Sequence, residues 1–115
     1  MSDAPVDVVQ RQLEAYNRRD LEAFCAVFAE DAAILDLGAA APSFSGKAAI
    51  RERYRGLFVN SPTLLSAIVS RTTLGRVVID HEHVTGRNGS SDVYEVIAIY
   101  EVEDGLIRRV HFVRA

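Results

Sequence analysis

The second half of the chain consists of long runs of β-branched and aromatic residues, separated by short breaks that contain glycine. The runs begin at Thr63, and the breaks are Leu74-Gly75, Asn88-Gly89 and Asp104-Gly105. Such runs are typical of β-strands, and glycine suits the tight turns that join them. The pattern therefore predicts four consecutive strands, each antiparallel to the next.

The Asn88-Gly89 dipeptide predicts how the second and third of these strands pair. Asn-Gly is the strongest short hairpin signal, and a two-residue turn here pairs His83 with Tyr94 and His81 with Val96. One face then carries both histidines among apolar residues, so we expect it to be the concave face, covered by helices. The opposite face would carry Asp80, Glu82, Glu95, Ile97 and Ile99.

The break at residues 103–105 leaves two registers open for the last strand. A three-residue turn with Gly105 in a bulge places one set of side chains inward, and a two-residue turn inverts the set. We favour the bulged turn, because the larger apolar side chains then join the concave face. In that form the inward residues are Leu106, Arg108, Val110 and Phe112, and His111 points outward.

The first half of the chain shows the spacing of amphipathic helices. Asp3 is placed to cap a first helix with Pro5 in its first turn, and Asp20 to cap a second that ends near Ala29. A short strand then reaches Asp36, and a third helix is expected over residues 47–58. We predict one α+β domain, residues 1–115, with three helices on a strongly curved, mainly antiparallel sheet that carries the early strand at its edge.

Asp36 ends the early strand and is the candidate general base. Because strand side chains alternate, it shares a face with Ile34 and lies either in solvent or at the rim of the space that the sheet encloses. Apolar surroundings would raise the pKa of its carboxyl group and make it an effective base near neutral pH. The simpler interpretation is a turn in which the carboxylate accepts hydrogen bonds from nearby backbone N–H groups.

Composition argues against several classes of partner. The formal net charge is −3 and the arginines are dispersed, so we expect no nucleic-acid partner. No apolar run approaches the length of a membrane span and the N-terminal residues do not resemble a targeting segment, so we expect a cytoplasmic protein without a membrane partner. The single cysteine, Cys25, is expected to be a small buried side chain.

His81 and His83 lie two residues apart on the same strand, a spacing that metal ligands also use. No third ligand of convincing geometry is evident beside them, so we predict neither a metal ion nor another cofactor. Two adjacent imidazoles are hard to satisfy in a dry interior, and we weigh them equally as core and as site residues.

Several short motifs are spread over nearly the whole chain. They are Val9-Gln10-Arg11, Asn17-x-x-Asp20-Leu21, Phe28-Ala-Glu-Asp31-Ala, Ser45-Gly-Lys-Ala-Ala-Ile-Arg-Glu-Arg-Tyr54 and Tyr100-Glu-Val-Glu-Asp-Gly-Leu-Ile107. Together they resemble the nuclear-transport-factor-2-like superfamily, and within it the SnoaL-like cyclases and ketosteroid isomerases. The resemblance implies a cone-shaped fold, which hosts enzymes, binding proteins and adaptors alike.

By this resemblance Asp36 takes the place of the isomerases' general base and Tyr54 that of a supporting tyrosine. Their two hydrogen-bond donors to the enolate do not match, since Gln12 and Ala98 stand in those places. Losing one such donor typically costs roughly a hundred- to a thousandfold in rate, so steroid isomerase activity should be absent or feeble. Limonene epoxide hydrolases of this fold use an arginine and two aspartates, and His83 and Thr85 lie near two of those positions, which argues against epoxide hydrolysis too.

We therefore expect a small-molecule pocket protein of the SnoaL or ketosteroid-isomerase type. As an enzyme it would be a cofactor-independent isomerase, lyase, cyclase or hydrolase acting on an apolar carbonyl or polycyclic compound, with Asp36 as base and His83, His81 or Gln12 as donor. The alternative is a non-catalytic ligand-binding or dimerisation module of the same fold. The residues expected to contact the small apolar ligand are Gln12, Tyr16, Tyr54, Tyr94, Ala98, Val110 and Phe112.

The convex face of the sheet is expected to join two copies of the chain. In the favoured register it presents a contiguous apolar patch, which a monomer would leave in solvent. The patch consists of Ile97, Ile99, Ile107 and Val113. We predict a homodimer through this face, as the resemblance also implies.

Overall fold

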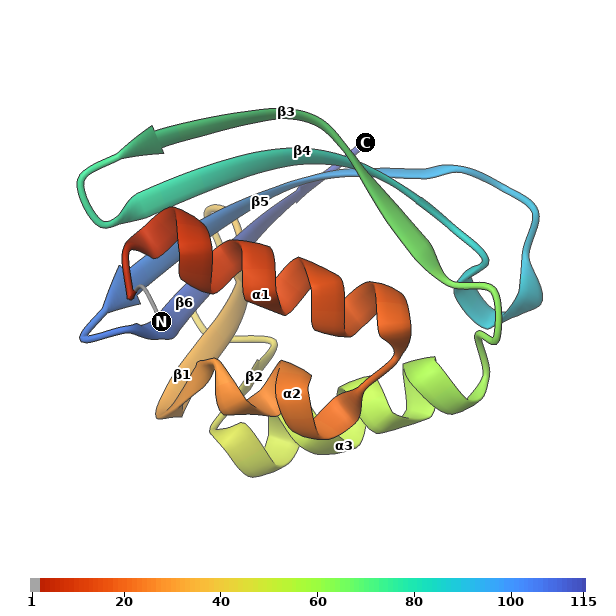
Figure 1. Cartoon of the computed structure of the whole chain (residues 1–115), viewed down its shortest axis with the longest axis horizontal. Coiled ribbons are helices and arrows are strands. Elements are labelled where there is room, and N and C mark those ends of the chain that lie inside the picture. The colour runs from red at the N-terminus through yellow and green to blue at the C-terminus, as the bar shows by residue number, and fades with distance from the viewer. Residues whose placement is uncertain (1–2) are drawn as a thin grey trace.

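A six-stranded curved sheet and three α-helices make up residues 3–115, the part of the chain that the computed structural model describes (Figure 1). The helices are α1 (Pro5–Arg18), α2 (Leu21–Ala26) and α3 (Lys47–Val59). The strands are β1 (Phe28–Asp36), β2 (Phe44–Ser45), β3 (Leu65–Leu74), β4 (Val77–Thr85), β5 (Tyr94–Glu103) and β6 (Leu106–Arg114). Their order is β2-β1-β6-β5-β4-β3, antiparallel except for the parallel pair β1 and β6. The predicted α+β class is confirmed.

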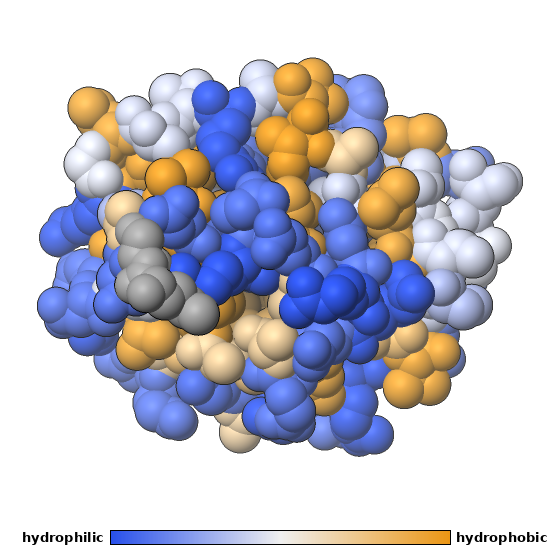
Figure 2. Space-filling model, in the orientation of Figure 1, coloured by the Kyte–Doolittle hydropathy of each residue, from blue (hydrophilic) through white to orange (hydrophobic). Residues whose placement is uncertain are grey.

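The helices cover the concave side of the sheet. The long helix α1 packs against β3 to β6, while α2 and α3 pack against β1 (Figure 1). The apolar side of α1 faces inward, with Val8, Val9 and Ala15 fully buried. The surface over α1 is mainly hydrophilic, with hydrophobic side chains in separate small patches (Figure 2).

The N-terminal cap predicted from the sequence is observed at α2 but not at α1. The Oδ1 atom of Asp20 accepts a hydrogen bond from the N–H of Ala23 at 3.1 Å, so the predicted cap of α2 is confirmed. The expected cap of α1 is wrong, because Ala4 occupies the cap position and no side chain among residues 3–115 caps the helix. Asp3 instead pairs with Arg11, whose guanidinium lies 3.6 Å away. Cys25 is buried, as predicted, and burial raises the pKa of its thiol.

The predicted pairing of β4 with β5 is wrong by one residue. Asn88-Gly89 lies in a short 3-10 turn, η1 (Arg87–Gly89), within a longer connection over residues 86–93. The N–H of Asn88 donates to the Oγ atom of Ser61 at 2.8 Å, which ties this turn to the segment after α3. His83 consequently pairs with Glu95, and Val84 with Tyr94.

A shift of one residue moves every side chain of a strand to the other face. Asp80 and Glu82 are therefore buried on the concave side, 1% and 8% exposed. His81 and His83 lie on the convex face, opposite to the prediction, where both contact Glu95.

The last hairpin combines features of both predicted forms. Asp104 and Gly105 make a two-residue turn with positive φ angles, and Ile107 is fully buried. The pairing then slips by one residue between Ile107 and Arg109, which places a β-bulge at Arg108. The bulge restores the favoured facing farther along, so that Val110 and Phe112 point inward and His111 outward.

Candidate active site

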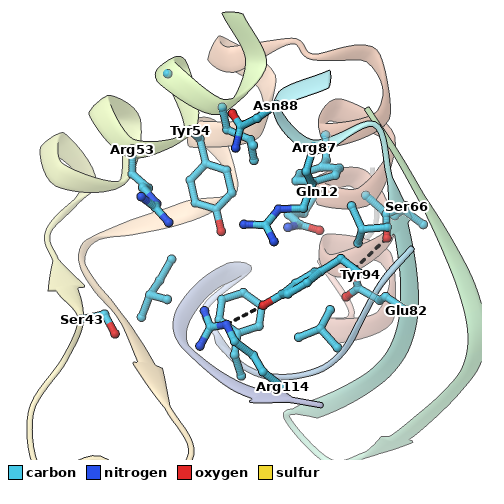
Figure 3. A pocket seen from close by; sticks show the side chains of 18 of the residues that line it. Gln12, Ser43, Arg53, Tyr54, Ser66, Glu82, Arg87, Asn88, Tyr94 and Arg114 are labelled. Atoms are coloured by element: carbon cyan, nitrogen blue, oxygen red, sulfur yellow. Dashed lines mark hydrogen bonds between the residues drawn. The ribbon is translucent and has the colours of Figure 1, made fainter. Parts of the chain in front are cut away.

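A pocket with a cavity volume of about 320 Å³ lies between α1, α3 and the concave side of the sheet (Figure 3). Apolar walls come from residues such as Leu13, Val84 and Val96, and polar groups converge from α1, α3, β3, β4 and the turn η1. An apolar enclosure with a few convergent polar groups is the usual form of a small-molecule site.

Glu82 is the buried carboxyl group of this pocket. Its Oε1 atom accepts a hydrogen bond from the Ser66 hydroxyl at 2.8 Å, and its Oε2 atom a longer one from the Tyr100 hydroxyl at 3.4 Å. Burial raises the pKa of Glu82 to about 7, against the lowering effect of the Ser66 hydrogen bond, and the carboxylate of Asp80 raises it further. Near neutral pH the group can therefore both accept and return a proton.

The nearby Arg71 guanidinium does not neutralise the charge of Glu82, because it is paired with Asp80. The Arg71 guanidinium grips Asp80 through two hydrogen bonds of 2.6 and 2.9 Å and donates a third, of 2.8 Å, to Gln10. In residues 3–115 Glu82 forms no ion pair. Glu82 is therefore a buried carboxyl group without a cation of its own among these residues, and this environment favours its protonated form more than water does.

Tyrosines supply much of the polar lining. Tyr16, Tyr54, Tyr94 and Tyr100 all face the cavity. Burial raises the pKa of Tyr16, Tyr54 and Tyr100, so these phenols stay protonated and can donate hydrogen bonds. The Tyr54 hydroxyl points into the cavity from α3 (Figure 3).

Arginines from three different elements reach the pocket. Arg53 comes from α3, Arg87 from η1 and Arg114 from the end of β6 (Figure 3). The Arg87 guanidinium stacks 4.1 Å from the centre of the Tyr94 ring, and the Nε atom of Arg114 donates to the Tyr94 hydroxyl at 2.5 Å. This side of the pocket therefore favours electronegative groups of a ligand.

The predicted ligand contacts fall into two groups. Gln12, Tyr16, Tyr54, Tyr94 and Phe112 line the pocket. The other two, Ala98 and Val110, belong to the buried core and do not line it.

The residues expected to be catalytic lie outside the pocket lining. Asp36 is half exposed and forms an ion pair with Arg114, which places it behind the pocket rim. His81 and His83 are on the far side of the sheet, for the register reason given above.

Sequence reasoning missed Glu82, and one signal could have found it. Gly86 adopts a positive φ of 80°, and Thr63 and Leu64 lie where a side chain would stand. Ending the strand at this glycine, and not at Asn88-Gly89, allows the one-residue shift that turns Glu82 inward.

Comparison with known proteins places this geometry in a family. The family model of the SnoaL-like domain matches residues 9–110. No curated protein matches the chain.

Solved structures share the whole architecture at low sequence identity. A cystatin-fold protein from Novosphingobium aromaticivorans, itself uncharacterised, has a TM-score of 0.87 and 24% identity, with 99% of each chain covered. A protein provisionally assigned as a ketosteroid isomerase, from Kribbella flavida, has a TM-score of 0.82 and 18% identity over 99% of this chain and 79% of its own. An LEH-like epoxide hydrolase from M. tuberculosis has a TM-score of 0.83 and 16% identity over 97% and 83%.

At these identities the solved structures establish the fold alone. The family model spans most of the chain, and the resemblance to the nuclear-transport-factor-2-like superfamily is confirmed. The chain therefore belongs to the SnoaL-like domain family.

Proposed function

We propose that this protein is a cofactor-independent enzyme that moves a proton on a small apolar carbonyl compound, with Glu82 as the general base. The observation that carries the proposal is a buried carboxyl group whose pKa is about 7, facing a pocket with both apolar and polar lining residues. Active sites commonly raise the pKa of a carboxyl group by burial to do this work at neutral pH. Glu82 thus takes the role that the resemblance implied for Asp36.

The proposed chemistry is an enolisation. The Glu82 carboxylate takes a proton from the carbon beside the carbonyl group, the C–H electron pair forms the new C=C bond, and the π pair of the C=O bond moves onto the carbonyl oxygen. The Tyr54 hydroxyl and the Arg87 guanidinium, which both point into the cavity (Figure 3), are placed to donate hydrogen bonds to that oxygen. In a carbonyl compound with a C=C bond between its β and γ carbons, the enolate extends over that bond, and return of the proton from Glu82 to the γ carbon completes an isomerisation.

The size of the pocket limits the substrate. A volume of about 320 Å³ is near the lower end of the range for ligand pockets, about 300–1,000 Å³. We infer a molecule of one or two rings in preference to a steroid, with its electronegative groups toward Arg53, Arg87 and Arg114.

The test measures how much Glu82 and Asp36 each contribute to proton abstraction from a simple substrate. In 5-nitrobenzisoxazole a base removes one C–H proton, the electron pair forms a nitrile and the N–O bond breaks to give a coloured phenolate. We expect the protein to accelerate this reaction with an apparent pKa near 7, and Glu82→Gln to lower the rate about a hundredfold, typical for loss of a general base.

The matched control is Asp36→Asn, which removes a carboxylate outside the pocket lining and should retain most of the rate. Circular dichroism confirms that each variant is folded. Equal rates for the unmodified protein and Glu82→Gln, or an equal loss in Asp36→Asn, would refute Glu82 as the base. Binding of the probe without turnover would favour the non-catalytic alternative.

A further inference from the structure

His81 and His83 on β4 and Glu95 on β5 form a compact group on the convex face, which we call the convex cluster. The Nε2 atom of His81 lies 2.6 Å from the Oε2 atom of Glu95, and the Nε2 atom of His83 lies 3.2 Å from the same oxygen. The donor atoms all lie within 4.8 Å of one another. We propose that the convex cluster binds one divalent transition-metal ion of the zinc type, on the side of the sheet opposite the pocket.

The backbone itself arranges the three ligands. His81 and His83 share a face because they are two residues apart on one strand, and His83 pairs directly with Glu95 across the hydrogen-bonded ladder. The predicted register had placed Glu95 on the face opposite the histidines, so the third ligand came into view only with the observed pairing. Since both strands are central in the sheet, their Cβ positions are rigidly set.

The spacing fits a metal ion with little rearrangement. Ligands bonded at about 2.0–2.2 Å to a tetrahedral zinc ion stand roughly 3.3–3.6 Å apart. The shorter contacts in the convex cluster are 2.6 and 3.2 Å, so small side-chain rotations would open room for an ion between the three donor atoms. The two imidazole rings are nearly perpendicular, at 89°, which lets their nitrogens approach a common point from different directions.

The donor set selects the type of metal. Two imidazole nitrogens and one carboxylate oxygen suit zinc, nickel, cobalt or copper, whereas magnesium and calcium prefer oxygen ligands alone.

The site is open on its outer side. The three side chains are 32%, 46% and 49% exposed, and the residues paired with His83 and His81 on β3 are the small Ala67 and Ser70. An ion can therefore enter from solvent and keep water in its remaining coordination positions. Sites with three protein ligands and an open position are a common form of zinc site.

The experiment titrates ZnCl₂ into the tag-free full chain by isothermal calorimetry. We expect one ion per chain. His81→Ala, His83→Ala and Glu95→Gln should each lower the affinity at least about tenfold, since even second-shell changes cost roughly ten- to a hundredfold. The matched control is His111→Ala, which removes the chain's remaining histidine from the same convex face outside the cluster and should leave the affinity unchanged.

Cobalt offers a second readout. Adding CoCl₂ should give visible absorption bands of bound Co²⁺ that disappear in His83→Ala and persist in His111→Ala. Circular dichroism of each variant shows that the sheet remains folded. No zinc binding, equal affinity in the cluster variants and the unmodified chain, or an equal loss in His111→Ala would each overturn the proposal.

Discussion

At neutral and alkaline pH, the negative charge on the buried Glu82 lowers the stability of the folded chain. Its pKa is about 7 in the folded chain, against a usual 4.5, so the folded state holds the proton more tightly than the unfolded state. The stability that this more tightly held proton contributes is fully present below pH 4.5 and is lost as the pH rises through 7. A shift of this size corresponds to roughly 3 kcal/mol, and burial is its main cause.

Glu82→Gln should therefore stabilise the protein at alkaline pH. Glutamine keeps the shape of the side chain and can hydrogen-bond Ser66 and Tyr100, but it carries no charge to desolvate. At pH 8 we expect the variant to exceed the unmodified protein by about 3 kcal/mol in the free energy of unfolding, and at pH 5 by less than about 1 kcal/mol. Urea unfolding at both pH values measures this difference. A gap that does not change with pH would contradict the raised pKa.

The connection between β4 and β5 determines which side chains face the pocket. It begins at Gly86, where the backbone turns with a positive φ of 80° and passes close to Thr63 and Leu64. A Cβ atom at this position would lie 2.5 Å from the carbonyl oxygen of Thr63. Backbone atoms cannot move aside as a flexible side chain can, so only glycine fits here.

Gly86→Ala should be markedly more destabilising than Gly89→Ala. Both glycines have positive φ angles, 80° and 78°, so alanine meets similar backbone strain at each. Apart from its two chain neighbours, no atom of the described residues lies within 4 Å of a Cβ atom at Gly89, whereas the one at Gly86 would collide with the backbone. We expect an additional loss of about 1–3 kcal/mol for Gly86→Ala, from thermal unfolding of both variants. Similar losses would show that the 63–64 segment can yield.

Local patterns predicted the helical half of the pocket well and the sheet half poorly. Helical spacing turned Tyr16 and Tyr54 toward the interior, the family resemblance pointed to Gln12 and Tyr54 as site residues, and all three line the pocket. The register of β4 depends instead on the contact between Asn88 and Ser61, which are 27 residues apart. Asn-Gly is a strong hairpin signal only when the surrounding chain leaves it free to form the two-residue turn. Local sequence patterns do not reveal this long-range hydrogen bond, so they predicted neither the inward position of Glu82 nor the convex cluster.

The convex face shows why two copies of the whole molecule are expected to associate. Ile107, which the sequence placed there, is buried inside, and Ile79 takes its place beside Ile97, Ile99 and Val113. We propose that this revised patch joins two chains across a twofold axis, with the convex cluster beside Ile97 at the rim of the interface, where it stays open to solvent. The pocket opens on the other side of the sheet and would remain accessible.

Replacing both Ile97 and Ile99 with lysine should yield a monomer, because like charges would then meet across the twofold axis. Light scattering at micromolar concentration measures the mass. Leu74→Lys is the matched control, since Leu74 is an apolar residue, 82% exposed, at the β3–β4 turn and outside the patch. An unmodified protein that is already monomeric would rule out this dimer.

The positions of the tyrosines make the intrinsic fluorescence of the protein sensitive to occupancy of the pocket. The chain contains four tyrosines and no tryptophan, and all four tyrosines line the pocket. Ultraviolet emission from the unlabelled protein therefore arises from the pocket wall, without background from distant fluorophores. A ligand that enters must come between these rings or displace the water around their hydroxyls, and either change alters the intensity of emission. Libraries of unlabelled compounds can thus be screened for occupancy of this pocket before any reaction is known.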